Sequence, residues 1–87
     1  MKHIFVMYGS PATGKTQLTK LLRKDESILV IDNYIDNTVD MYNTLYVIQT
    51  YEASNIIIVT NTRPDNLIFE ISILDDTKLS VIEFTAN

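Results

Sequence analysis

The chain has 87 residues, 46% of them hydrophobic, with no cysteine, one histidine and a formal net charge of −4. This length fits a single domain over residues 1–87, and the composition excludes disulfides, thiolate metal sites and histidine metal clusters. The negative charge argues against nucleic acid as a partner of the isolated chain, and the lack of an export signal or a membrane-length apolar run predicts a cytoplasmic protein without a membrane partner.

The first part of the chain predicts a strand, a helix and a second strand. Residues 2–8 form a near-continuous apolar run that is typical of a central strand, and residues 27–32 form another. Between them, residues 15–24 predict a helix. Its expected buried face carries three leucines at helical spacing, Leu18, Leu21 and Leu22.

A second helix and a third strand follow. Asn37 or Thr38 caps the helix, and Asp40 lies in its first turn, where a carboxylate is favoured. The helix is expected to run to about residue 53. Its buried face is marked by Met41, Leu45 and Ile48. Residues 55–61 then read as a third buried strand.

The last quarter of the chain leaves two readings open. Pro64 favours the start of a helix, and a helix over 65–73 would allow the chain to cross back to the sheet. A turn over 75–78 and a fourth strand over 79–85 complete this preferred interpretation. The alternative is a hairpin, because 67–73 is strand-like in propensity and would run antiparallel to 79–85.

The alternation of strands and helices predicts an α/β fold in which a parallel sheet is covered by helices on both faces. In such a sheet, ligands bind outside the carboxyl ends of the strands. We therefore look for functional residues in the segments that directly follow the strands.

The segment after the first strand has the complete Walker A pattern, Gly9-x-x-x-x-Gly14-Lys15-Thr16, with a strand before it and a helix after it. Glycines allow such a loop to wrap tightly round a phosphate, and its backbone N–H groups form an anion-binding nest at the helix N-terminus. The chain has only two glycines, and both occupy required positions of the motif. The residues predicted to bind the nucleotide are Gly9, Ser10, Pro11, Ala12, Thr13, Gly14, Lys15, Thr16 and Gln17.

Side chains at four positions are expected to contribute chemistry at this site. Lys15 supplies a full positive charge to the β- and γ-phosphates, and Thr16 supplies a hydroxyl to Mg²⁺. Asp32 follows four apolar residues in a Walker B-like arrangement, so its carboxylate is a second candidate ligand of Mg²⁺. Asn61, at the end of the third strand, could position an attacking water. The predicted catalytic residues are therefore Lys15, Asp32 and Asn61.

These motifs together give a family resemblance. Walker A, then Leu29–Asn33, then Thr60–Asp65 resembles the ATPase core of the additional-strand class of P-loop proteins, in particular AAA+ ATPases and superfamily 3 helicases. The resemblance implies a three-layer P-loop NTPase fold with a four-stranded parallel sheet in the order 4-1-3-2. It also implies that Asp32 assists Mg²⁺ and that Asn61 is the sensor residue beside the γ-phosphate.

The chain departs from that family in ways that bear on hydrolysis. Asn33 stands where a catalytic glutamate would follow Asp32, and an amide cannot act as a general base. The segment 75–78 lacks the arginines usual before the last strand, and no C-terminal helical lid is present in the 87 residues. Hydrolysis without such groups is slow.

We therefore expect an Mg²⁺- and ATP-binding domain that acts as a small ATPase or an ATP-driven switch. One alternative is a nucleotide-binding partner or regulatory protein that does not hydrolyse ATP, and a less favoured one is a small phosphotransferase. In a homo-oligomer or a complex with another protein, a neighbouring subunit could supply the catalytic groups that this chain lacks. Such an assembly could also create a basic channel for nucleic acid. The basic cluster Lys20, Arg23 and Lys24 is nevertheless explained by the dipole of its own helix.

Overall fold

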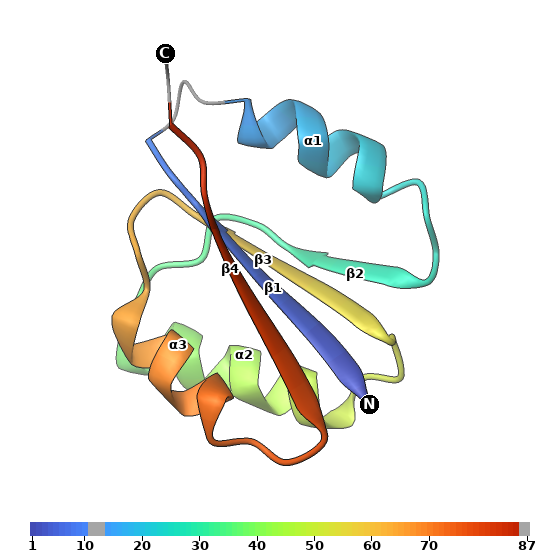
Figure 1. Cartoon of the computed structure of the whole chain (residues 1–87), viewed down its shortest axis with the longest axis vertical. Helices are drawn as coiled ribbons and strands as arrows, with labels where there is room; N and C mark the ends of the chain where they lie inside the picture. The colour runs from blue at the N-terminus through green and yellow to red at the C-terminus, as the bar shows by residue number, and fades with distance from the viewer. Residues whose placement is uncertain (11–13, 86–87) are drawn as a thin grey trace.

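The computed structural model describes residues 1–10 and 14–85 and has three layers (Figure 1). A parallel sheet lies in the middle, with helix α1 on one face and helices α2 and α3 on the other. The elements in chain order are β1 (Lys2–Tyr8), α1 (Lys15–Leu22), β2 (Ile28–Ile31), α2 (Thr38–Thr50), β3 (Asn55–Thr60), α3 (Asp65–Ser72) and β4 (Thr77–Glu83).

The four strands are all parallel and lie in the order β2–β3–β1–β4. This is the expected order 4-1-3-2 read from the other edge. β1 is central and pairs with β3 on one side and β4 on the other, with Tyr8 opposite both Thr60 and Glu83. The carboxyl ends of β1, β3 and β4 therefore meet at one edge of the sheet.

The larger core lies between the sheet and the α2–α3 layer. It contains eight buried residues that come from both central strands, both helices and the loop after β2. They are Ile4, Val6, Tyr34, Ile48, Ile56, Ile58, Leu67 and Ile71. Alternate residues of β1 and β3 point to this face, as the two-residue period of a strand requires.

A smaller core lies under α1. Its buried residues are Met7, Ile57 and Val59, and the apolar side chains around them are only partly buried. Leu18 and Leu22 pack there, but Leu21 is 63% exposed, so its predicted place in the core is wrong. The inward face of α1 is formed instead by Lys15, Leu18, Thr19 and Leu22, at helical spacing. Thr19 tolerates burial because its hydroxyl donates to the carbonyl of Thr16, at 2.9 Å.

The segment after Pro64 is a helix, as preferred from the sequence, and the hairpin alternative is wrong. β4 pairs in parallel with β1, so α3 has to carry the chain back across the sheet. β4 begins at Thr77, two residues earlier than expected, because Thr77 pairs with Lys2 and the Lys2 N–H donates to the carbonyl of Asp76.

The two ends of α2 are fixed by identifiable polar contacts. The Asn37 side chain accepts from the N–H of Asp40 at 2.8 Å, so Asn37 is the N-cap. The helix ends at Thr50 rather than near residue 53, since Tyr51 is extended. There the Lys2 ammonium, reaching from β1, donates to the carbonyls of Ile48 and Tyr51. α1 likewise ends at Leu22, before residue 24.

Candidate functional site

A small cleft of about 190 Å³ opens at the carboxyl edge of the sheet. It lies where α1 begins and where β2 and β3 end. Its lining residues are Lys15, Thr16, Asp32, Asn33, Val59, Thr60 and Asn61. The structure therefore brings Lys15, Thr16, Asp32 and Asn61, which are far apart in the sequence, to one place. Three further residues predicted to bind a ligand, Pro11, Ala12 and Thr13, lie outside the described residues.

The two glycines of the loop are required for different reasons. A Cβ at Gly9 would lie 2.3 Å from the carbonyl oxygen of Phe84, so the close approach of the end of β4 excludes any side chain. Gly14 is the N-cap of α1 and has φ +87°, a left-handed conformation that side chains disfavour. A Cβ at Gly14 would meet nothing within 4 Å. Packing thus explains Gly9, and backbone conformation explains Gly14.

The side chain of Lys15 turns back toward the loop that precedes it. Its ammonium donates to the carbonyls of Gly9 and Ser10, the latter at 2.7 Å, and only 6% of the residue is exposed. A buried cation is costly unless polar groups surround it. The loop therefore holds a positive charge at the N-terminus of α1, where the helix dipole adds further positive potential. Thr16 and Gln17 are exposed at the start of the same helix.

Asp32 follows β2 and is partly exposed. One oxygen of its carboxylate accepts from the N–H of Asn33 at 2.8 Å, and the other lies 3.8 Å from the guanidinium of Arg23. Asn33 adopts φ +58°, a conformation that asparagine tolerates better than most residues. Sequence reasoning assigned Arg23 to the dipole of α1 and missed its contact with Asp32. Its position at the end of the helix that connects to β2 is the signal that could have indicated it.

The loop after β2 is tied to β3 by backbone and side-chain hydrogen bonds. The N–H of Tyr34 donates to the carbonyl of Val59 at 3.0 Å, and the Thr60 hydroxyl donates to the carbonyl of Tyr34 at 2.8 Å. These bonds fix the segment holding Asp32 and Asn33 against the strand that leads to Asn61. The position of the lining groups is therefore set by buried contacts, although Asn61 itself is exposed.

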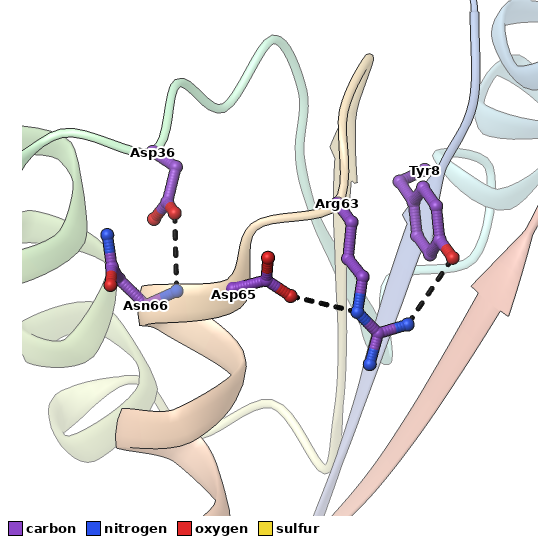
Figure 2. A network of polar contacts seen from close by, with 5 residues as sticks. All are labelled: Tyr8, Asp36, Arg63, Asp65 and Asn66. Carbon is purple, nitrogen blue, oxygen red and sulfur yellow. Dashed lines mark hydrogen bonds and ion pairs between the residues drawn. The ribbon is translucent and has the colours of Figure 1, made fainter.

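A polar network extends from this loop to α3 (Figure 2). The Tyr34 hydroxyl donates to one oxygen of Asp36 at 3.0 Å, and the other oxygen accepts from the N–H of Asn66 at 3.3 Å. Burial, followed by the contact with Asp36, raises the pKa of the Tyr34 hydroxyl above its ordinary value. Asp36 thus satisfies a free N–H group at the start of α3, a role that the sequence did not reveal.

Arg63 lies at the same edge of the sheet, but its guanidinium is engaged by neighbours. It donates to Asp65 at 2.9 Å and to the Tyr8 hydroxyl at 3.3 Å, and it lies 5.7 Å from the centre of the Tyr8 ring (Figure 2). The hydrogen bonds to Tyr8 and then Asp65 raise the pKa of Arg63. These contacts join the loop after β3 to the end of β1.

No family model, curated protein or solved structure matches this chain. Within the described residues, no cluster of three or more carboxylate or imidazole groups is able to hold a metal ion. None of the described helices is both long and apolar enough to span a membrane.

Proposed function

We propose that this domain binds ATP with Mg²⁺ through the loop 9–16, in the manner of P-loop proteins of the additional-strand class. The observation that carries the proposal is the meeting of Lys15 and Thr16, at the start of α1, with Asp32 and Asn61, at the ends of β2 and β3. A cation, a hydroxyl, a carboxylate and an amide at one helix N-terminus form a set suited to phosphates and a hard divalent ion.

The residues of the loop fit a phosphate ligand. Lys15 donates to two carbonyl oxygens of its own loop, and phosphate oxygens are stronger acceptors for the same ammonium. The open space beside Gly14 leaves the backbone accessible. The cleft is smaller than a typical pocket for a complete ligand, roughly 300–1,000 Å³, so we assign it to the phosphates and the metal, with the base and ribose outside it.

Thr16 and Asp32 supply the oxygen ligands for Mg²⁺, which keeps several waters and takes further oxygens from the nucleotide. Among the described residues, Asp32 is held by a long ion pair with Arg23 and by the N–H of Asn33. Its carboxylate can therefore exchange Arg23 for the water shell of a metal. Mg²⁺ bound with the nucleotide neutralises phosphate charge beside Lys15.

We further propose that the domain works as a slow ATPase or as an ATP-driven switch, with Asn61 orienting water near the γ-phosphate. A specific observation favours the alternative of a binding protein without hydrolysis. Asn33 lines the cleft directly after Asp32, and its amide cannot take a proton from water. A phosphotransferase is less favoured, because the elements of the described residues include no lid and the sequence has only seven basic residues.

Calorimetric titration with Mg²⁺-ATP tests the binding proposal. We expect binding by the wild type and a loss of at least about tenfold in affinity for Lys15→Ala, which removes a charge-assisted hydrogen bond to phosphate. Lys20→Ala is the matched control, because Lys20 is an exposed lysine on the same helix. Equal affinity of the wild type and Lys15→Ala, or no binding by the wild type, would contradict the proposal.

Phosphate release in the same samples separates a slow ATPase from a binding protein. We expect slow release that disappears in Asp32→Ala and decreases in Asn61→Ala. Binding without release in the wild type would favour the regulatory alternative. Transfer of the γ-phosphate to a small acceptor would instead identify a phosphotransferase.

A further inference from the structure

The charges of this protein are divided between the two outer layers. Residues 14–24, which contain α1, include four basic residues and no acidic one. The segments 33–53 and 64–76, which contain α2 and α3, have three and four acidic residues and no lysine or arginine. α1 covers one face of the sheet and α2 and α3 cover the other, so the basic residues of α1 and the acidic residues of α2 and α3 lie on opposite sides of the sheet (Figure 1). Because the exposed Asp25 and Glu26 come directly after this segment, the positive charge is confined to α1 and the turn at its end.

The side covered by α2 and α3 also exposes large apolar side chains. Val39, Tyr42 and Tyr46 form a stripe along the outer surface of α2, and Tyr42 and Tyr46 are 63% and 68% exposed. Phe69 and Ile73 are similarly exposed on α3. A helix in a soluble protein normally carries charged residues on its outer surface. The only charged residue within α2 is Asp40, in its first turn. We call these five residues the α2–α3 patch.

The surface around the patch is hollowed at both ends of α2. A groove of about 300 Å³ lies between the start of α2 and α3, and its lining includes Met41, Phe69 and Glu70. A second groove, of about 580 Å³, lies near the end of α2, and its lining includes Gln49, Ile73 and Asp75. The patch thus combines exposed apolar surface with hollows and with acidic residues around it, and an apolar patch rimmed by polar residues is typical of a protein interaction site.

The outer surface of α1 is complementary to this patch in charge. Lys20 and Leu21, on α1, and Lys24, in the turn just after the helix, are all exposed. In the described part of the chain, Lys20 and Lys24 make no ion pair. Leu21 lies between them as an exposed apolar residue. We call Lys20, Leu21 and Lys24 the α1 stripe.

The basic residues nearest to the patch already have partners. The Lys2 ammonium is taken up by the carbonyls at the end of α2, and Arg63 by Asp65 and Tyr8. A positively charged partner with an exposed apolar residue would therefore fit the patch. The α1 stripe of a second copy has both properties.

We propose that this protein associates head to tail, with the α1 stripe of one copy docked on the α2–α3 patch of the next. The two surfaces lie on opposite sides of the sheet, so a copy that uses one of them keeps the other available. Such a heterologous contact gives a ring if its rotation closes and an open filament if it does not. The association requires neither nucleotide nor the residues of the cleft.

Sedimentation of the wild type over a range of concentrations and salt tests the association itself. At low salt we expect the mass to rise with concentration to at least twice the monomer mass of 10.0 kDa. Raising the salt shortens the Debye length from about 30 Å at 0.01 M to about 3 Å at 1 M, so the mass should fall again. A monomer at every concentration in low salt would overturn the proposal and leave a different protein as the occupant of the patch.

Two variants test the head-to-tail geometry. The first is the double variant Lys20→Glu with Lys24→Glu in the α1 stripe, and the second is Tyr42→Ser with Tyr46→Ser in the patch, which removes apolar surface without adding a charge that could attract the first variant. All four positions are exposed, so both variants should fold, which circular dichroism checks. Lys78→Glu is the control, because Lys78 is an exposed lysine of β4 outside both surfaces. We expect each double variant alone to be monomeric and the control to associate like the wild type.

Mixing the two double variants is the decisive step. The first keeps an intact patch and the second keeps an intact α1 stripe, so a head-to-tail contact predicts a one-to-one dimer that grows no further. Association of either variant alone would show that like surfaces pair, and would overturn the proposal. Failure of the mixture to form a dimer would overturn it as well.

Discussion

The two faces of the sheet differ in how tightly they are packed. Eight buried residues form the core beneath α2 and α3, whereas three form the core beneath α1. Two helices cover the first face, and a single helix of eight residues covers the second. The difference teaches that the fold is stabilised mainly on one face, while the candidate phosphate-binding loop and its helix belong to the other.

This division has a consequence for ligand binding. α1 is too short to be stable by itself, and its side chains Leu18 and Leu22 are only partly buried against the sheet. A ligand that holds the start of α1 would add contacts where the protein has the fewest. Stability and binding should therefore respond to substitutions on different faces.

Cavity-forming substitutions on the two faces should have the most unequal effects. We expect Ile58→Ala, in the larger core, to lower the free energy of unfolding by about 2–5 kcal/mol, because its side chain is fully buried. Leu18→Ala, under α1, should cost about 1–2 kcal/mol, because that side chain is partly exposed already. Urea denaturation followed by circular dichroism measures both. Equal losses in the free energy of unfolding would contradict the conclusion that the two faces are packed differently.

The glycines of the loop offer a second, smaller contrast. Gly9→Ala places a Cβ against the backbone oxygen of Phe84, so we expect a loss of roughly 1–3 kcal/mol as β4 is displaced. Gly14→Ala meets no neighbouring atom and should cost about 1–2 kcal/mol from its left-handed backbone alone. Thermal denaturation gives the two losses, and backbone amide chemical shifts in β4 should change only for Gly9→Ala. Unchanged β4 shifts in Gly9→Ala would refute the role given to Phe84.

The pH dependence of stability tests the role of the Tyr34 hydroxyl, which lies at the edge of the larger core. The pKa of Tyr34 is raised in the folded protein, so its contribution is complete below the ordinary tyrosine pKa of about 10 and is lost as the pH rises above that value. Tyr34→Phe should cost about 1 kcal/mol at neutral pH, from the lost bond to Asp36, and should reduce the decline above pH 10. Tyr42→Phe, on the exposed surface, is the control. An identical alkaline decline in the wild type and Tyr34→Phe would contradict this assignment.

The smallest effect is expected at the ion pair beside the cleft. Arg23→Gln should change the free energy of unfolding by less than about 1 kcal/mol, because the pair with Asp32 is long and partly exposed. The same variant should increase the affinity for Mg²⁺ in the presence of ATP, since it removes a competing cation from Asp32. Lys20→Gln removes a charge from the same helix and serves as the control. If Arg23→Gln lowered the free energy of unfolding by more than about 2 kcal/mol, the ion pair with Asp32 would be important for the stability of the fold, contrary to this expectation.

Much of the fold could be predicted from the sequence, because its strands are short apolar runs between clear loops. β1 was predicted with its observed bounds, and the other strands within about two residues. The helical interpretation of 65–73 is confirmed by α3. It was predictable because the chain needs a crossover there to return to a parallel sheet. Leu21 was misplaced because the inward face of α1 includes Lys15 and Thr19 beside Leu18 and Leu22, which leaves Leu21 on the outer side of the helix. Contacts with the sheet decide which leucines face inward.

The candidate site was predicted only in part, and the remaining contacts are long-range. The sequence indicated that Lys15, Thr16, Asp32 and Asn61 would meet, because each follows a parallel strand or begins the helix after one. It gave no sign that Phe84 fixes Gly9, since that contact depends on the exact path of β4. The capping of α3 by Asp36 was missed because it depends on how the loop after β2 lies against the start of α3.

Amide hydrogen exchange with and without Mg²⁺-ATP is the most direct test of the central claim that the nucleotide binds on the weakly packed face. We predict that Mg²⁺-ATP slows exchange in α1 and in the segments after β2 and β3, while exchange in the core of α2 and α3 changes little. Lys15→Ala should abolish this protection without altering the pattern of the free protein. Protection confined to α2 and α3, or no change anywhere with saturating nucleotide, would contradict the account.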